Sequence, residues 1–562
     1  MRTSRKSAAG KHRPDVLVLP MGELDDIVTR ARTSPLSEED CAKLRASVGT
    51  LWWLHQELDK QTLTLARMRS MFGLSTSEKT KVVLDKAQQG EAQPEPEKGQ
   101  RPEKEPKPKP KPKGHGRNGA SDYVGAERIK VPHDSLKSGD PCPICPESYR
   151  GKVYLLREPH TLVRVVGQAP LKAKLFECEC LRCGLCGKVF NAPAPPGVGD
   201  KKYDATAASM IALLKYGTGI PFSRLERLQG NLGIPLPVAT QWEIVSEASQ
   251  ELLPVLNELV RQAAQGRLMH NDDTSMQVLE LRREIDRLEK SGETDRTGIF
   301  TSSIVSELDD GHRIALFFTG RKHAGENITD LLRHRASGLA PPMQMCDGLD
   351  RNLPKEFKTV LANCLAHGRR KFVEVVDSFP NECRFVLETL RDVYQNDALA
   401  LERGLSDIER LQYHQAHSGP LMQGLDRWMR EQIEQKRVEP NSTLGGSIAY
   451  MRKRWDRLTL FLRKAGAPLD NNICERALKK AILNRRNALF YKTENGARVG
   501  DLFMSLIHTA ELAGKNALDY LTALLQHSAQ VQRSPGQWLP WTHRATLGEG
   551  TATATDGAVA SR

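Results

Sequence analysis

RLMHNDDTSMQVLEL, residues 267–281, opens the part of the chain that decides the fold, and we predict that it forms a strand. Two further strands are expected at 297–306 (TGIFTSSIVS) and 312–320 (HRIALFFTG). A helix over 324–336 and a fourth strand at 342–349 (PMQMCDGL) follow. Three strands that can form a meander, then a crossover helix and a further strand, are typical of a ribonuclease-H-like sheet. We therefore expect a multidomain α+β protein with a ribonuclease-H-like core.

Acidic residues on adjacent strands of such a sheet converge. Asp272 lies on the first strand, and Asp347 lies where the fourth strand ends at a glycine. A third acid, Glu475, follows a segment of helical periodicity, which predicts a helical insertion over 373–466 within the catalytic fold. Carboxylates that meet repel one another unless cations lie between them, and oxygen ligands suit Mg²⁺ or Mn²⁺. The three acids predict a site for two such ions, an arrangement that serves phosphoryl displacement.

Each acid also has a purely structural explanation. The first acid and its neighbour Asp273 fit a cap at a strand end, and alternation does not decide between them because polar residues occupy both faces. Asp347 fits a simple turn. Glu475 lies three residues after Asn472 and four before Lys479, which fits a capping box and a stabilising ion pair. Taken singly, these explanations compete with the metal site.

A strongly basic helix surrounds the third acid, in the stretch APLDNNICERALKKAILNRR (467–486). A basic face favours a polyanion, whereas a lone carboxylate on that face repels one. Both features are explained if Glu475 holds a metal ion while the cations hold a phosphate backbone. A second basic cluster lies in CLAHGRRKF (364–372). The candidate DNA-binding residues are Arg369, Arg370, Lys371, Arg476, Lys479, Arg485 and Arg486.

The second basic cluster also contains Cys364 and His367. The histidine would orient a phosphate or a water, or it is a buried, hydrogen-bonded side chain. With the cysteine it offers two ligands of a metal site, without a visible partner.

Composition agrees with a nucleic-acid-binding protein. The formal net charge is +13 and the pI about 9.2, which favours contact with nucleic acid or another anionic surface. The sequence contains no run of 18 apolar residues, so no membrane helix is predicted. The basic start lacks the apolar stretch of a signal peptide. We expect a cytoplasmic, nucleoid-associated protein in which the 11 cysteines are metal ligands or buried thiols.

Two Cys-x-x-Cys pairs predict a structural zinc site: Cys142 with Cys145, and Cys183 with Cys186. Each pair presents two thiolates from a tight turn, as tetrahedral zinc requires, and glycines follow both cysteines of the second pair. Two further cysteines, Cys178 and Cys180, leave the second pair open because Cys180-x-x-Cys183 forms a competing turn.

The segments before the core are expected to be accessory. Leucines and a phenylalanine at intervals of seven between 44 and 72 predict a zipper-like helix, with a helix packed on its own protein as the alternative. Residues 86–121 are rich in Pro, Lys and Glu and predict an extended linker, either a spacer or an arm along DNA. Three short helices over 203–250 predict a helix-turn-helix with PVATQWEIVSEA (237–248) as recognition helix, or a plain bundle.

Four blocks resemble the insertion sequence 66 transposases: HNDDT (270–274), CLAHGRRKF (364–372), DNNICERALK (470–479) and NRRNALFYKTENGAR (484–498). They occur in one order, and the resemblance spans nearly the whole chain. It implies a DDE recombinase with a helical insertion before the glutamate. Asp272 takes the place of the Asp in that family's Asp-Glu-Thr, Asp347 is the second acid and Glu475 the third.

The expected function is therefore that of a bacterial DNA transposase. Water, activated by a metal ion, would nick DNA at terminal inverted repeats, and the freed 3′-OH would attack target DNA. We expect the protein to form a homo-oligomer that pairs the two ends of the element. The resemblance also implies small accessory proteins of the same element. The rivals are a nuclease of the same fold and a zinc-containing DNA-binding protein without catalysis.

Eight regions follow from these predictions. They are an N-terminal region (1–85), a linker (86–121), a zinc module (122–196), a helical DNA-binding region (197–264), a first core part (265–372), the insertion (373–466), a second core part (467–530) and a tail (531–562).

Overall fold

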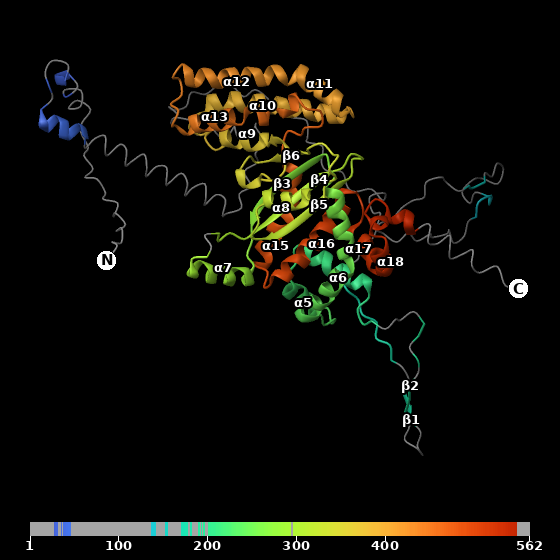
Figure 1. The fold of residues 1–562 in the computed structure, drawn as a ribbon. Coiled ribbons are helices and arrows are strands. Elements are labelled where there is room, and N and C mark those ends of the chain that lie inside the picture. The colour runs from blue at the N-terminus through green and yellow to red at the C-terminus, as the bar shows by residue number, and fades with distance from the viewer. Residues whose placement is uncertain are drawn as a thin grey trace, which may run out of the picture. The chain divides into compact units, whose positions relative to one another are not determined.

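A computed structural model (Figure 1) describes one long part of the chain almost without interruption, over 201–293 and 296–547. Outside it, only short stretches between 27 and 45 and between 137 and 196 are described. The chain forms two compact units, one made of Met1–Glu91 with Val376–Pro380 and the other of Ala92–Val375 with Asn381–Arg562. Nearly all of the predicted zipper helix, the linker and the side chains of the six zinc-module cysteines lie outside the described residues. Everything below concerns the second unit.

A five-stranded mixed sheet forms the centre of this unit. Its strands are β3 (Leu268–Ser275), β4 (Phe300–Glu307), β5 (Arg313–Gly320), β6 (Met343–Cys346) and β7 (Val360–Asn363). The order across the sheet is β5-β4-β3-β6-β7, with β3, β4 and β5 antiparallel and β6 and β7 parallel to β3. This is the strand order of a ribonuclease-H-like sheet, and the prediction is confirmed.

Two local predictions about the sheet need correction. The first strand ends at Ser275, not Leu281, because the apolar residues that follow it begin helix α7 (Leu279–Ser291). The fifth strand, β7, was not predicted, since its four residues carry too short a pattern. The crossover helix α8 (Ala324–Leu332) begins where it was predicted and ends four residues earlier, and a capping box of His323 and Glu326 closes its start.

Helix α16 (Glu494–Leu512) protects the free edge of the sheet. It packs along β5, and its side chains accept hydrogen bonds from alternate backbone N–H groups of that strand. Ala315 N–H donates to Thr509 Oγ1 (3.1 Å), Phe317 N–H to Ser505 Oγ (3.0 Å) and Thr319 N–H to Asp501 Oδ2 (2.6 Å). Four helix residues rise about 6 Å and two strand residues span about 6.6 Å. Every fourth residue of α16 therefore lies opposite every second residue of β5.

Three helical segments precede the sheet, as predicted for 203–250. They are α4 (Ala205–Ala212) continued by η3 (Leu213–Gly217), α5 (Phe222–Asn231) and α6 (Val238–Ala263). The predicted recognition helix is the start of α6, which is longer than expected and buries one face along the core. DNA contact by these helices stays a prediction.

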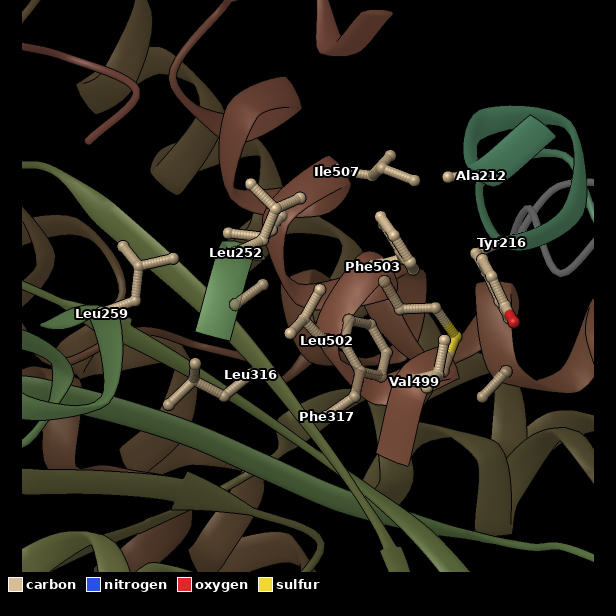
Figure 2. Close-up of a cluster of buried hydrophobic side chains, with 14 of the residues drawn as sticks. Ala212, Tyr216, Leu252, Leu259, Leu316, Phe317, Val499, Leu502, Phe503 and Ile507 are labelled. Atoms are coloured by element: carbon tan, nitrogen blue, oxygen red, sulfur yellow. The ribbon is translucent and has the colours of Figure 1, made fainter. Parts of the chain in front are cut away.

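The main core lies between the sheet and the helices on one side of it (Figure 2). Residues of η3, α6, β5 and α16 interlock there, and the rings of Tyr216 and Phe503 stack with centroids 5.4 Å apart. The C-terminal segments α17 (Ala517–Gln526), α18 (Ser528–Arg533) and η6 (Pro535–Trp538) add Trp538 to the same core. Within the described residues no helix is long and apolar enough to cross a membrane.

The chain between β7 and the final core helices is helical. Helix α9 (Leu365–Val373) follows β7 directly. The next elements are α10 (Pro380–Glu402), α11 (Asp407–His417), α12 (Gly419–Glu434), α13 (Thr443–Lys453), α14 (Trp455–Leu458) and η5 (Leu460–Leu462). Helix α12 packs against α11 and α13, and Phe385 of α10 lies against Trp428 of α12, with ring centroids 5.2 Å apart (Figure 1). Arg267, just before β3, forms ion pairs with Asp407 of α11 and with Glu307 of β4, and so ties this segment to the sheet.

Candidate active site

The parallel pairing of β3 with β6 sets Asp272 and Asp347 side by side. Leu268 pairs with Met343, and the two following residues of each strand pair in step. Partners differ by 75 positions, which is also the separation of Asp272 and Asp347. Asp347 directly follows β6, and Asp272 lies within β3 two residues beyond the part of that strand that pairs with β6. This is the arrangement that the sequence predicted.

Asp272 and Asp273 belong to opposite faces of β3, because successive strand residues alternate. Asp273 is fully engaged: its Oδ1 accepts from Ser302 Oγ (2.7 Å) and its Oδ2 lies 2.9 Å from His323 Nδ1. On the face of Asp272, His270 Nδ1 lies 3.1 Å from Asn471 Oδ1 at the start of helix α15 (Asn472–Ala488). The structure thus resolves the pair: Asp273 is bound within the fold, and Asp272 lies on the face that α15 covers.

The carboxyl group of Asp272 is largely buried and lies near other acidic side chains. Burial, aided by the negative charges of Asp347, Asp273 and Glu475, raises the pKa of Asp272 to about 7. A hydrogen bond from Asp273 N–H to Asp272 Oδ1 (2.8 Å) acts in the opposite direction. A carboxyl group whose pKa is raised by burial and by neighbouring acids marks a candidate functional site.

Asp347 serves the turn after β6 with one oxygen. Its Oδ1 accepts from Leu349 N–H (3.0 Å) and from Asn352 Nδ2 (2.7 Å), so the turn explanation is correct for that atom. Its Oδ2 has no hydrogen-bond partner among the described residues. The backbone carbonyl of Asp347 accepts from Tyr450 Oη of α13 (3.3 Å), which braces the turn from the helical segment.

Glu475 reaches this face because α15 is fastened to β3 and β4. Asn471 Nδ2 donates to the carbonyl of Asn271 (3.0 Å), and Cys474 Sγ donates to the carbonyl of Ser303 (3.3 Å). Ser303 is the register partner of Asp272 across the antiparallel pair. The first turn of α15 therefore lies over the strand position that carries Asp272, and Glu475 belongs to that turn.

The capping explanation of Glu475 is wrong. Helix α15 starts at Asn472, and Asp470 accepts the Asn472 N–H (3.0 Å). Within the described region Glu475 forms neither a capping bond nor an ion pair with Lys479, and its Oε1 is buried without a hydrogen-bond partner. A buried carboxylate oxygen without a partner calls for an explanation, and a bound cation would supply one.

Helix α9 brings two softer ligands to the same glutamate. Ligand atoms of Cys364, His367 and Glu475 all lie within 4.8 Å of one another, with His367 Nδ1 3.8 Å from Glu475 Oε1. Burial raises the pKa of the Cys364 thiol to about 11. Sequence reasoning noticed the cysteine and the histidine but missed their third partner, because the glutamate lies far along the chain.

The predicted DNA-binding residues divide into three groups. Arg476, Lys479 and Arg486 are exposed on α15 and form no ion pair within the described residues. Arg485 is used internally, because its Nη1 donates to Thr274 Oγ1 (3.1 Å) and Ser275 Oγ (2.6 Å) at the end of β3. On α9, Lys371 pairs with Glu374 (3.0 Å), and Arg369 and Arg370 lie beside it in the same helix.

Comparison with known proteins identifies the family of this chain. A model of the family described as "Transposase IS66 family" matches residues 201–499, more than half of the chain. The chain belongs to the IS66 transposase family. Membership implies DNA transposition and DNA binding, and the DDE type of this family implies a divalent metal ion.

Three proteins from Sinorhizobium fredii (strain NBRC 101917 / NGR234) are similar to part of this chain. The uncharacterized protein y4jD is 26% identical over 382 residues, which cover 65% of this chain and 71% of that protein. The uncharacterized protein y4hP is 25% identical over 401 residues, covering 66% and 69%. The uncharacterized protein y4qI is 25% identical over 333 residues, covering 57% and 58%.

The residues present fit the metal that the IS66 family implies. Three carboxylates approach one another, with the Oδ2 of Asp347 and the Oε1 of Glu475 free of hydrogen bonds in the described structure. Carboxylate oxygens are the ligands of Mg²⁺ and Mn²⁺. The zinc prediction for Cys142, Cys145, Cys183 and Cys186 concerns side chains outside the described residues and stays a prediction.

Proposed function

We propose that this IS66 transposase cleaves DNA at the ends of its element and joins the freed 3′-OH to target DNA. Asp272, Asp347 and Glu475 form the catalytic site in this proposal. The observation that supports it is that Asp347, after β6, and Glu475, on α15, lie close enough to Asp272 of β3 to raise its pKa, while the buried Oε1 of Glu475 has no hydrogen-bond partner among the described residues.

Each part of the site has a role in the proposal. Asp272, Asp347 and Glu475 would hold two Mg²⁺ or Mn²⁺ ions, which would supply activation of the attacking oxygen and stabilisation of the leaving 3′ oxygen. Tyr450 fixes the turn that carries the second acid. Exposed cations of α15 hold the phosphates on either side of the cleaved bond. Since the nucleophiles are water and DNA, no side chain becomes linked to DNA.

The remaining predictions complete the proposal. A four-thiolate zinc module would be structural or DNA-contacting, because it leaves no open coordination position. Two ends of an element must be held together, which favours a homo-oligomer. Accessory proteins of the same element are expected only from the resemblance to the family.

A strand-transfer assay tests the proposal. The full chain is supplied with a duplex that carries the terminal inverted repeat of its element, already cleaved to expose a 3′-OH, and with a supercoiled target plasmid. We expect Mg²⁺-dependent joining of the end to the plasmid. Cleavage of uncut ends without any joining would instead support the nuclease, and binding without either reaction would support the DNA-binding protein.

Matched variants make the result specific to the three acids. Asp272→Asn, Asp347→Asn and Glu475→Gln remove charge while nearly preserving shape, so DNA binding should survive and both reactions should fall at least 100-fold. Glu289→Gln, a carboxylate exposed on α7, makes the same change away from the site and should react like the parent. Parent-like cleavage by all three site variants would contradict the proposal.

A further inference from the structure

Two large apolar side chains protrude where α15 ends. Leu489 is 64% exposed and Phe490 is 45% exposed, although the next residue, Tyr491, is buried. Adjacent exposed Leu and Phe side chains are unfavourable in water unless a partner covers them. They belong to the block NRRNALFYKTENGAR, of which the proposed function uses the exposed Arg486 but leaves the apolar pair unexplained.

The backbone of Leu489 is held in a conformation that residues with a side chain rarely adopt. Its φ is 69° and its ψ −46°, and Phe490 N–H donates to the carbonyl of Ala488 (2.9 Å). This is a γ-turn with positive φ, a rare and strained form. Strain of this kind persists only where the surroundings impose it, and it clusters at functional positions.

Both sides of the turn are anchored. Before it, Leu489 N–H donates to the carbonyl of Arg485 (2.9 Å). After it, Tyr491 N–H donates to the carbonyl of Gln277 and Leu279 N–H donates to the carbonyl of Tyr491, both at 2.9 Å. The apolar pair is therefore presented from a fixed support, which keeps it from folding back onto the protein.

An exposed stripe on α15 connects the catalytic glutamate with this turn. Arg476, Lys479, Leu483 and Arg486 recur at helical spacing along the exposed face. Within the described residues the three cations of this stripe form no ion pair. A surface of unpaired cations favours a polyanion and opposes a second copy of the same basic chain.

We propose that Leu489 and Phe490 form a wedge that inserts between base pairs of the transposon end. This inference rests on the proposed function, since the DNA would follow the α15 stripe from the cleaved phosphate to the wedge. Apolar side chains inserted into a duplex unstack one base step and bend the DNA. Fourteen residues of helix separate Glu475 from Leu489, a rise of about 21 Å. The unstacked step therefore lies about six base pairs from the cleaved bond, at 3.4 Å per base pair.

Fluorescence of 2-aminopurine tests the wedge directly. Duplexes of the terminal inverted repeat carry one 2-aminopurine at successive positions, and the full chain is added with Ca²⁺ so that binding occurs without cleavage. We expect fluorescence to rise at least threefold only at positions about five to seven base pairs from the cleavage site. A flat profile with the parent protein bound would overturn the wedge.

Variants separate the wedge from general damage. Leu489→Gly removes the side chain and suits a positive φ, so the variant should fold at least as well as the parent, and with Phe490→Ala it should abolish the signal. Leu401→Ala on α10 truncates another exposed leucine (59% exposed) and should keep the signal. If the double variant keeps the parent's fluorescence profile, the wedge is wrong.

Cleavage distinguishes failure of the wedge from failure of the proposed function. With Mg²⁺ the double variant should cleave at least tenfold more slowly than the parent, and a mismatch placed at the unstacked step should restore most of the rate. Parent-like rates on matched duplex would contradict the wedge while leaving the transposase proposal intact. A parent that never cleaves would contradict the transposase proposal itself. A change in sedimentation of the variant without DNA would assign the apolar pair to contact between copies.

Discussion

At the scale of single residues, Asp272 and Asp273 are neighbours that meet opposite surroundings. Asp273 accepts from Ser302 and lies against His323, so both of its carboxylate oxygens have partners within the fold. Asp272 faces Asp347 and Glu475, so in the absence of cations its charge is opposed. A one-residue step along a strand separates a structural acid from the acid that we assign to the metal site.

Substitution of these two acids should change stability in opposite directions. Asp273→Asn loses charge-assisted hydrogen bonds and should lower the free energy of unfolding by about 1–3 kcal/mol. Asp272→Asn removes a repelled charge and should raise the stability of the metal-free protein at pH 8. Urea unfolding followed by circular dichroism measures both. Equal destabilisation by the two variants would argue against this division of roles.

At the scale of elements, α16 solves the problem of the open sheet edge at β5. An uncovered edge strand presents N–H groups that can pair with another chain. Asp501, Ser505 and Thr509, one helical turn apart, accept from three of these N–H groups. The contact is polar but dry, so each hydrogen bond matters to stability.

Loss of these acceptors should be costly. Ser505→Ala with Thr509→Val leaves two buried N–H groups of β5 without partners, at a cost of about 1–3 kcal/mol each. Thermal unfolding should show a clear loss for the double variant. The control, Thr509→Ser, keeps the hydroxyl and should lose much less. A double variant as stable as the parent would mean that α16 does not satisfy this edge.

Asp501 should make stability depend on pH. Burial raises the pKa of Asp501 to about 7, above the value near 3.8 expected in the unfolded chain. The folded state therefore favours the protonated carboxyl, and the contribution of Asp501 to stability is fully present below pH 4 and is lost as pH rises through 7. Between pH 4 and 8 the ionisation of Asp501 should lower the free energy of unfolding by up to about 4 kcal/mol, and this decrease should be absent in Asp501→Asn. Parallel stability curves for the two proteins would contradict the assignment.

At the scale of the whole molecule, the strand order brings together residues that are far apart in sequence. The central position of β3 places it between β4, whose Ser303 anchors α15, and β6, whose end carries Asp347. A long helical segment separates these elements from Glu475, yet Tyr450 of that segment contacts the Asp347 turn. Insertion and core therefore support the same site.

Zinc content tests the accessory module, whose cysteine side chains lie outside the described residues. We expect about one zinc ion per chain in the purified protein, because four thiolates fill a structural site. Cys142→Ser should lower the zinc content and weaken DNA binding without abolishing cleavage of short ends. Unchanged zinc content in this variant, measured by atomic absorption, would remove Cys142 from the ligand set.

Sequence alone predicted most of the sheet, because buried strands leave runs such as HRIALFFTG. It failed after Ser275, where apolar residues of a strand and of α7 look alike over a short window. It left a capping box as the structural alternative for Glu475, which local spacing permits but the hydrogen bond from Asn472 N–H to Asp470 replaces. The choice between Asp272 and Asp273, and the approach of His367 to Glu475, required contacts between distant parts of the chain.

Binding of Mn²⁺, followed by electron paramagnetic resonance on the full chain bound to a duplex of its element's end, tests the central claim most directly. The account predicts that about two ions bind per site and that Asp272→Asn, Asp347→Asn and Glu475→Gln each weaken their binding at least tenfold, while Glu289→Gln does not. A site variant that binds Mn²⁺ as tightly as the parent would show that the three carboxylates do not share these ions.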